Sequence, residues 1–194
     1  MQPSPDSYKI LGVDPGTNIL GYAILEVSGK QVKIITFGVI KLFKEENQAL
    51  KLKEIFLQVQ EIIESYLPKY LAIEAPFYGK NVQSMLKLGR AQGVAIAAGI
   101  TMGLEVNEYS PKLIKKSVTG NGNASKEQVS AMLESILKVK IQSEYHDATD
   151  ALATAYCHYN QHGFGTGTKE KLAGGWKSFL QQNPERIKKQ GPGK

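Results

Sequence analysis

Three β-compatible runs follow one another at the start of the chain with only a few residues between them. The runs cover 8–14, 19–27 and 32–40, and turn-forming residues such as Gly16 and Gly29 separate them. Connections this short can join antiparallel strands, but they cannot hold the long crossover that parallel strands need. The first forty residues therefore predict an antiparallel three-stranded meander.

Helices and short strands alternate through the rest of the sequence. Apolar residues recur at helical spacing between Glu46 and Leu67, where Pro68 ends the pattern, and such spacing indicates an amphipathic helix. Two more short strands are predicted at 70–74 and 104–109, and further helices at 82–102, 111–118, 126–138 and 147–159. This order predicts an α/β fold in which a mixed five-stranded sheet is flanked by helices.

The segment before the helix at 126–138 carries a start signal. Gly120 to Asn123 predict a turn, because Gly and Asn readily adopt positive φ. Ser125 is a good N-cap, and we expect Gln128, three residues later, to form only part of a capping box.

Composition and charge suggest how the chain is divided. A length of 194 residues suits one domain of ordinary size, and the single cysteine, Cys157, allows no intrachain disulfide. The formal charge is +6, and the segment after residue 164 concentrates it, with seven basic against two acidic residues. We expect a folded domain at 1–163 and a flexible, basic tail at 164–194.

Neither a secretory signal nor a membrane-spanning segment is predicted. The first residues are polar, and the most apolar run, 94–102, is far shorter than the roughly 20 residues that cross a bilayer. We therefore expect a cytoplasmic protein without a membrane partner.

Four carboxylates stand where the predicted topology can bring them together. Asp14 ends the first strand and Glu74 ends the strand after the first long helix, while Asp147 and Asp150 lie three residues apart at the start of the last helix. Crowded carboxylates repel one another unless a cation neutralises them, and oxygen ligands favour Mg²⁺ or Mn²⁺. Two such ions roughly 3.5–4 Å apart would stabilise the attacking and leaving oxygens of a phosphodiester displacement.

Ordinary structural roles compete with this interpretation. An Asp before Pro-Gly often forms a turn, which would explain Asp14, and an Asp at a helix start often caps it, which would explain Asp147. Glu74 is harder to dismiss, because it ends an apolar strand where an unpaired charge would be costly. Asp150 lies inside a helix that otherwise looks buried, so capping does not explain it.

Five motifs, taken in order, give the chain a resemblance to a known family. They are 11–17 (LGVDPGT), 21–22 (GY), 72–74 (AIE), 87–95 (KLGRAQGVA) and 146–153 (HDATDALA). Each motif alone is weak, but the ordered set over about 8–162 closely resembles RuvC, the family of bacterial Holliday junction resolvases.

The resemblance implies a ribonuclease H-like fold and a homodimer with two active sites. It also implies symmetric, metal-dependent nicking of opposed strands at a four-way DNA junction, in cooperation with the branch-migration proteins RuvA and RuvB. Asp14, Glu74, Asp147 and Asp150 match the family's metal-binding carboxylates, which we expect to hold two Mg²⁺ ions, with Mn²⁺ as a substitute. Some members carry His in place of Asp147, so the neighbouring His146 leaves the assignment open, although a solvent-exposed histidine is the simpler interpretation.

The resemblance also indicates residues that contact DNA. Phe77 matches an aromatic that stacks on a base near the junction centre, and its alternative is an ordinary core residue. Lys115 and Lys126 match lysines that face the DNA backbone, and their alternative is a solvated side chain. Weaker candidates for the same surface are Lys80, Lys87, Arg90 and Lys116.

Three further interpretations compete with a resolvase or extend it. His158 and His162 have a spacing that can bind metal on a helix, but we expect them to be surface histidines. The Asp-Pro-Gly-Thr turn at 14–17 could serve an actin-like phosphotransferase, although that fold needs a second lobe. The chain could also be a catalytically silent junction-binding module, and loss of cleavage without loss of binding in a carboxylate variant would argue against it.

Overall fold

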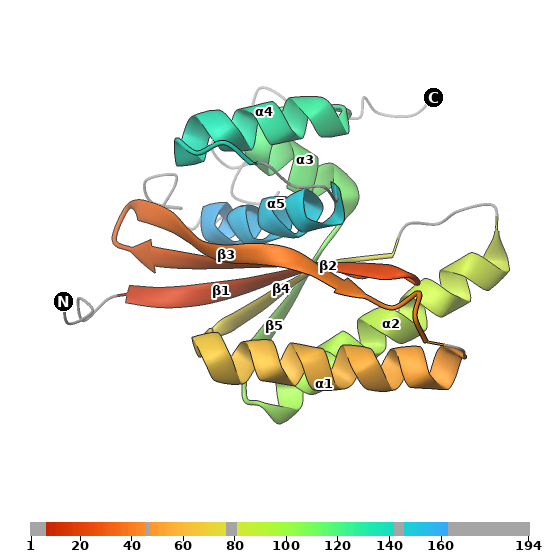
Figure 1. The fold of residues 1–194 in the computed structure, drawn as a ribbon. Coiled ribbons are helices and arrows are strands. Elements are labelled where there is room, and N and C mark those ends of the chain that lie inside the picture. The colour runs from red at the N-terminus through yellow and green to blue at the C-terminus, as the bar shows by residue number, and fades with distance from the viewer. Residues whose placement is uncertain (1–6, 46, 77–80, 142–145, 163–194) are drawn as a thin grey trace, which may run out of the picture.

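A computed structural model of the protein describes residues 7–45, 47–76, 81–141 and 146–162. Within these ranges a five-stranded sheet lies between two groups of helices (Figure 1). Phe77 and the predicted tail at 164–194 lie outside the described residues. The elements are β1 (Ser7–Asp14), β2 (Ile19–Ser28), β3 (Gln31–Lys41), α1 (Gln48–Tyr66), β4 (Tyr70–Glu74), α2 (Val82–Thr101), β5 (Glu105–Tyr109), α3 (Pro111–Thr119), α4 (Lys126–Leu137) and α5 (His146–Gln161).

The sheet is mixed, as the sequence predicts. Its strand order is β3-β2-β1-β4-β5, and β1, β2 and β3 form the expected antiparallel meander. Strands β4 and β5 run parallel to β1, because α1 and α2 supply the long crossovers. The carboxyl ends of β1, β4 and β5 therefore meet at one edge of the sheet.

Large aliphatic side chains fill the space between the sheet and the layer of α1 and α2. Because side chains alternate along a strand, Leu11 and Val13 of β1 and Leu71 and Ile73 of β4 all reach this face. From the helix side, buried residues such as Ile55 meet them. Figure 1 shows α1 and α2 together on this side of the sheet.

The opposite face carries α5, which lies directly on the sheet beneath α3 and α4 (Figure 1). Glycines on the strands let the helix backbone come close. A Cβ atom on Gly12 would lie 2.2 Å from the carbonyl oxygen of Ala151, and a Cβ atom on Gly21 would lie 1.9 Å from that of Asp147. The helix is rich in buried small residues, and its thiol, Cys157, is fully buried as well. No side chain larger than hydrogen fits at these two strand positions.

The start of α4 is more completely capped than the sequence suggested. The hydroxyl of Ser125 accepts a hydrogen bond from the Gln128 backbone N–H at 3.3 Å, and the Gln128 side chain accepts one from the Ser125 N–H at 2.9 Å. Both halves of a capping box are thus present, and the expectation of a partial box is wrong. The amide of glutamine reaches back as a glutamate carboxylate would.

The expectation of a surface position is also wrong for His158, which has no exposed area. Its Nδ1 lies 2.9 Å from the hydroxyl of Tyr109, and its ring lies 4.7 Å from that of Tyr70. Burial lowers the pKa of His158 to about 3, so the ring is neutral at physiological pH. His162 is exposed, as expected, and stacks on it at 3.9 Å. The spacing of the two histidines could not reveal which of them faces the sheet.

Among the helices that the structure describes, none combines the length and the apolarity needed to cross a bilayer.

Candidate active site

Strand alternation and register place two of the four carboxylates side by side. Along β1, Ile10 and Gly12 face α5, so Asp14, two residues further, faces it too. Along β4, Tyr70 and Ala72 face the same helix, and Glu74 follows them. Gly12 pairs with Ala72 in parallel register, which brings the ends of the two strands level. Asp14 and Glu74 therefore leave neighbouring strands at the same edge and on the same face.

Helix α5 brings the other two carboxylates to this edge. Gly21 is the antiparallel partner of Asp14, and the carbonyl of Asp147 lies directly over Gly21. The first turn of the helix is therefore held next to Asp14. Asp150, one turn further, faces a cavity of about 130 Å³ together with Asp14 and Glu74. The cavity is lined by Asp14, Glu74, Pro111, Ile114, Lys115, Lys126, Val129, Asp150 and Ala153.

Asp147 is absent from this lining but remains electrostatically close. Its negative charge acts on both Asp14 and Lys126. The structure thus brings Asp14, Glu74 and Asp150 into one cavity and leaves Asp147 beside it, at the start of the helix.

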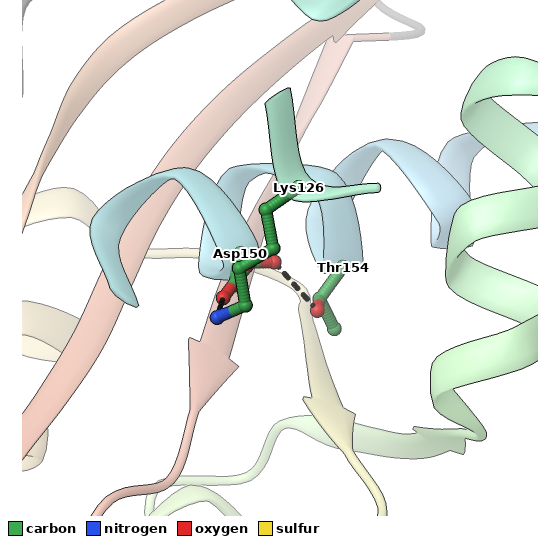
Figure 2. Close-up of polar contacts among 3 residues, drawn as sticks. All are labelled: Lys126, Asp150 and Thr154. Atoms are coloured by element: carbon green, nitrogen blue, oxygen red, sulfur yellow. Dashed lines mark hydrogen bonds and ion pairs between the residues drawn. The ribbon is translucent and has the colours of Figure 1, made fainter. Parts of the chain in front are cut away.

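Two lysines predicted to contact DNA lie in the same cavity. Lys126, the first residue of α4, donates a hydrogen bond to Oδ2 of Asp150 at 2.5 Å (Figure 2). The backbone carbonyl of Asp150 accepts a second hydrogen bond, from the hydroxyl of Thr154 at 2.9 Å. Burial opposes the charge of Lys126, but the hydrogen bond to Asp150 and the surrounding carboxylates raise the pKa of its ammonium. Lys115, from α3, lines the cavity from the other side and is half-buried.

The carboxyl groups are poorly solvated and repel one another. Burial, followed by the charges of Glu74, Asp150 and Asp147, raises the pKa of Asp14 to about 8. Burial and the charge of Asp150 raise the pKa of Glu74 to about 7, although Lys126 and Lys115 partly offset this. At neutral pH, these groups compete for protons in the absence of a stronger cation.

The residues fit a hard divalent cation by their chemistry. All of the convergent anionic donors are carboxylate oxygens, which Mg²⁺ and Mn²⁺ prefer, and a bound cation would remove the repulsion that holds protons on Asp14 and Glu74. In the present side-chain arrangement of the described residues, however, no three His, Cys, Asp or Glu side chains are grouped to hold a metal ion.

The remaining candidates from the sequence are separated from this cavity or cannot be placed. His146 is exposed at the first position of α5, in keeping with a solvent histidine. Lys87, Arg90 and Lys116 are exposed, and none of them lines the carboxylate cavity. Phe77 and Lys80 lie outside the described residues.

Sequence reasoning gave no role to Gln92, although it lies within one of the family-like motifs. This side chain of α2 is buried, and its Nε2 donates to Oε2 of Glu108 at 2.7 Å. It also lies 3.5 Å from the carbonyl oxygen of Glu74, at the outer limit of a hydrogen bond. Gln92 thus braces the ends of β4 and β5 from the face opposite α5. A polar residue among the small residues of α2 was the available signal.

The sequence resembles those of known proteins along most of its length. A family model described as crossover junction endodeoxyribonuclease RuvC matches residues 10–158. Crossover junction endodeoxyribonuclease RuvC of Cytophaga hutchinsonii is 55% identical over 92% of this chain and 88% of its own length. The protein of the same name from Bacteroides fragilis is 54% identical over 92% of this chain and 95% of its own length.

Solved structures resemble the chain in fold. Thermus thermophilus RuvC superposes with a TM-score of 0.73 at 29% identity, over 81% of this chain and 97% of that one. The structure of T. thermophilus RuvC in complex with Holliday junction substrate gives a TM-score of 0.75 at 28% identity, over 82% and 97%. The yeast mitochondrial Holliday junction resolvase Ydc2, at 15% identity and a TM-score of 0.59, shares the fold. The expected ribonuclease H-like architecture is confirmed, and the chain belongs to the RuvC family of crossover junction endodeoxyribonucleases.

Proposed function

We propose that this protein is a structure-selective endonuclease that resolves four-way DNA junctions by symmetric, metal-dependent phosphodiester hydrolysis. Family membership supports the nuclease activity, and the T. thermophilus relative solved with a Holliday junction substrate supports the choice of DNA. The observation that carries the proposal is the cavity where Asp14, Glu74 and Asp150 meet Lys115 and Lys126. Acidic groups for a metal and basic groups for a phosphate stand there within one small volume.

Asp14, Glu74, Asp147 and Asp150 are the residues that would hold the metal. Two Mg²⁺ ions, or Mn²⁺ in their place, would supply activation of a water and stabilisation of the leaving oxygen. Asp14 and Glu74 are fixed by the sheet, whereas Asp147 and Asp150 are fixed by the close contact of α5 with Gly21 and Gly12. The four oxygen donors thus belong to two rigid elements packed directly on each other.

The lysines would place the DNA backbone. A second, more open cavity of about 350 Å³ adjoins the carboxylate cavity, and the two share Pro111 and Lys115. Its other lining residues are Lys112, Gly122 and Asn123. Lysines neutralise phosphates as point charges. A DNA strand whose scissile phosphate lies at the carboxylates can therefore continue past Lys115 towards Lys112.

Symmetric cleavage of two opposed strands requires two such sites. We therefore include in the proposal a homodimer, cytoplasmic location, stacking of Phe77 on a base, and cooperation with RuvA and RuvB, all of which rest on the family resemblance. The basic segment at 164–194 is proposed as a separate tail that adds to DNA affinity.

The direct test is cleavage of a labelled four-way junction with and without Mg²⁺. The wild-type protein should make paired nicks in opposed strands only with metal, and Asp14→Asn should lower the rate by about 10³-fold or more, since hydrolysis loses a ligand that no neighbour replaces. Glu64→Gln, an exposed acid on α1 at the far face, is the matched control and should cleave normally. Tight junction binding without any cleavage by the wild-type protein would favour the silent binding module instead.

A further inference from the structure

The contact between Lys126 and Asp150 joins two elements that are far apart in sequence. The ammonium comes from the first residue of α4 and the carboxylate from the second turn of α5, and their atoms lie 2.5 Å apart (Figure 2). The capping box at Ser125 fixes the backbone from which Lys126 extends. The Asp150 side chain keeps only 20% of its area exposed, so few other partners can reach it. The ion pair is therefore held in place by the elements that form the cavity.

The ammonium contacts an oxygen of Asp150 that is also a candidate metal ligand. Asp14 and Asp147 act on Lys126 electrostatically, in addition to the direct contact with Asp150. Lys126 thus supplies positive charge to Asp14, Asp147 and Asp150 in this arrangement. In the same arrangement, no three acidic or histidine side chains among the described residues are grouped as metal ligands. An ammonium and a divalent cation at the same carboxylate would repel each other strongly in this partly buried cavity.

We propose that Lys126 and the divalent metal ion compete for Asp150. In the metal-free protein the ammonium holds the carboxylate, and metal binding releases Lys126 towards the mouth of the cavity, where a DNA phosphate becomes its partner. This inference rests on the proposed function, because it concerns the same metal site. Binding would then follow a fixed order, because Lys126 becomes available to the phosphate only after the metal ion has bound.

The first experiment measures Mn²⁺ binding to the full chain without DNA, by calorimetry, at fixed pH and ionic strength. Lys126→Met should tighten Mn²⁺ binding by roughly three- to tenfold, because a competing unit charge is removed. Lys115→Met is the matched control: it removes an equal charge from the same cavity, but the contact recorded at Asp150 belongs to Lys126. It should tighten binding distinctly less. Lys126→Gln, a polar substitute, should reproduce the effect of Lys126→Met.

The outcomes separate this inference from the proposed function. Mn²⁺ binding that Lys126→Met leaves unchanged or weakens would overturn the competition, and so would an equal gain in Lys115→Met. Failure of the wild-type protein to bind Mn²⁺ at all would count against the metal requirement of the proposed function, and with it the competition.

A second experiment reads the contact itself. In protein labelled with ¹⁵N-lysine, the Lys126 ammonium signal is identified by its loss in Lys126→Met. Hydrogen bonding to Asp150 slows exchange of its protons with water. Saturating Mg²⁺ should abolish this protection, and an ammonium signal that stays protected at saturation would contradict the proposal.

Discussion

The two faces of the sheet are packed by different means. On the side of α1 and α2, branched aliphatic side chains fill the space, with Leu11, Val13, Ile55, Val59, Leu71 and Ile73 all buried. On the side of α5, glycine and alanine line much of the contact, and the helix backbone rests on the strands at Gly12 and Gly21. The four carboxylates lie on the second side.

The difference shows that one face of a sheet can contribute mainly to stability while the other fixes the position of a helix. Side chains that interdigitate can shift or change rotamer when a neighbour changes, so the aliphatic face tolerates adjustment. A main-chain carbonyl over a glycine has no such freedom. The position of α5, and with it that of Asp147 and Asp150, is therefore fixed by hard contact. The aliphatic face, packed by α1 and α2, buries most of the large apolar side chains. The glycine face, packed by α5, fixes the positions of the carboxylates.

The largest effect on cleavage is expected from a comparison that adds one methyl group to each face in turn. Gly21→Ala would place a Cβ atom 1.9 Å from a backbone oxygen, so α5 must move. We expect a loss of about 3 kcal/mol in stability and a fall of more than about 100-fold in cleavage, because the carboxylates no longer meet. Gly99→Ala would place its Cβ atom 2.6 Å from the Cδ2 atom of Leu71, the end of a side chain that can rotate.

Gly99→Ala should therefore stay within about 1 kcal/mol of the wild-type stability, helped by the better helix propensity of alanine, and should keep its cleavage rate. Urea unfolding and junction cleavage would be measured for both variants. The contrast between the faces breaks down if the two substitutions cost the same stability and the same activity.

The second effect concerns the aliphatic face alone. Leu71→Ala leaves a cavity beneath the sheet and should cost about 2–5 kcal/mol. Its cleavage rate per folded molecule should remain near that of the wild-type protein at low temperature, because the carboxylates are held from the other side. Chemical denaturation gives the first quantity, and cleavage corrected for the folded fraction gives the second. A rate that falls far more than the folded fraction would show that this face also sets geometry.

The third effect is the pH dependence of the metal-free chain. The raised pKa of Asp14, about 8, means that the folded state holds a proton which the unfolded state releases near its ordinary value of 3.8. The contribution of Asp14 to the free energy of unfolding is fully present below pH 3.8 and is lost as the pH rises towards 8. Melting temperature should therefore fall across this range, and Asp14→Asn should reduce the fall.

At pH 8 in a chelator, Asp14→Asn should be more stable than the wild-type protein by about 1–2 kcal/mol, or about 2–8 °C in melting temperature. Mg²⁺ should shrink this difference by stabilising the wild-type carboxylates. Melting curves with and without metal, recorded from pH 5 to 8.5, supply the test. A wild-type protein that gains stability with rising pH in chelator would contradict the buried, repelling carboxylates.

The smallest effect concerns the proposed path of DNA from the carboxylate cavity into the second cavity. Lys112 lines the second cavity, whereas Lys116, four residues later on the same helix, is exposed and lines neither cavity. Lys112→Gln should lower the slope of log affinity against log salt by about one unit for four-way junction DNA. Lys116→Gln should leave the slope nearly unchanged, and equal slopes for both variants would remove Lys112 from the path.

Much of this architecture could be predicted from local patterns. Strand alternation and turn residues predict the meander. A helical crossover between strands predicts parallel pairing, which brings the carboxyl ends of β1 and β4 to the same edge of the sheet. Asp14 and Glu74, as the last residues of these strands, are therefore predicted to be neighbours. The rotational phase of α5 could not be predicted in the same way, and His158 was wrongly expected at the surface. Periodicity shows that a helix has a buried side but leaves open which residues lie at its margin.

Contacts between remote elements were the other gap. The pairing of Lys126 with Asp150 depends on where α4 lies over α5, and no spacing within either helix encodes it. The same holds for Gln92, whose partner Glu108 stands on a separate strand. Glycines 12 and 21 were visible as motif residues, but only the crossing helix shows why a methyl group is excluded there.

The single thiol of the chain offers a way to watch the glycine face open. Cys157 is fully buried in α5, the helix that carries Asp147 and Asp150, and burial raises the pKa of its thiol. A thiol reagent can reach it only when that helix leaves the sheet or the whole domain unfolds. Labelling rates under native conditions therefore report opening events at α5, with no engineered probe. Their response to Mg²⁺ would measure how far metal binding suppresses those openings.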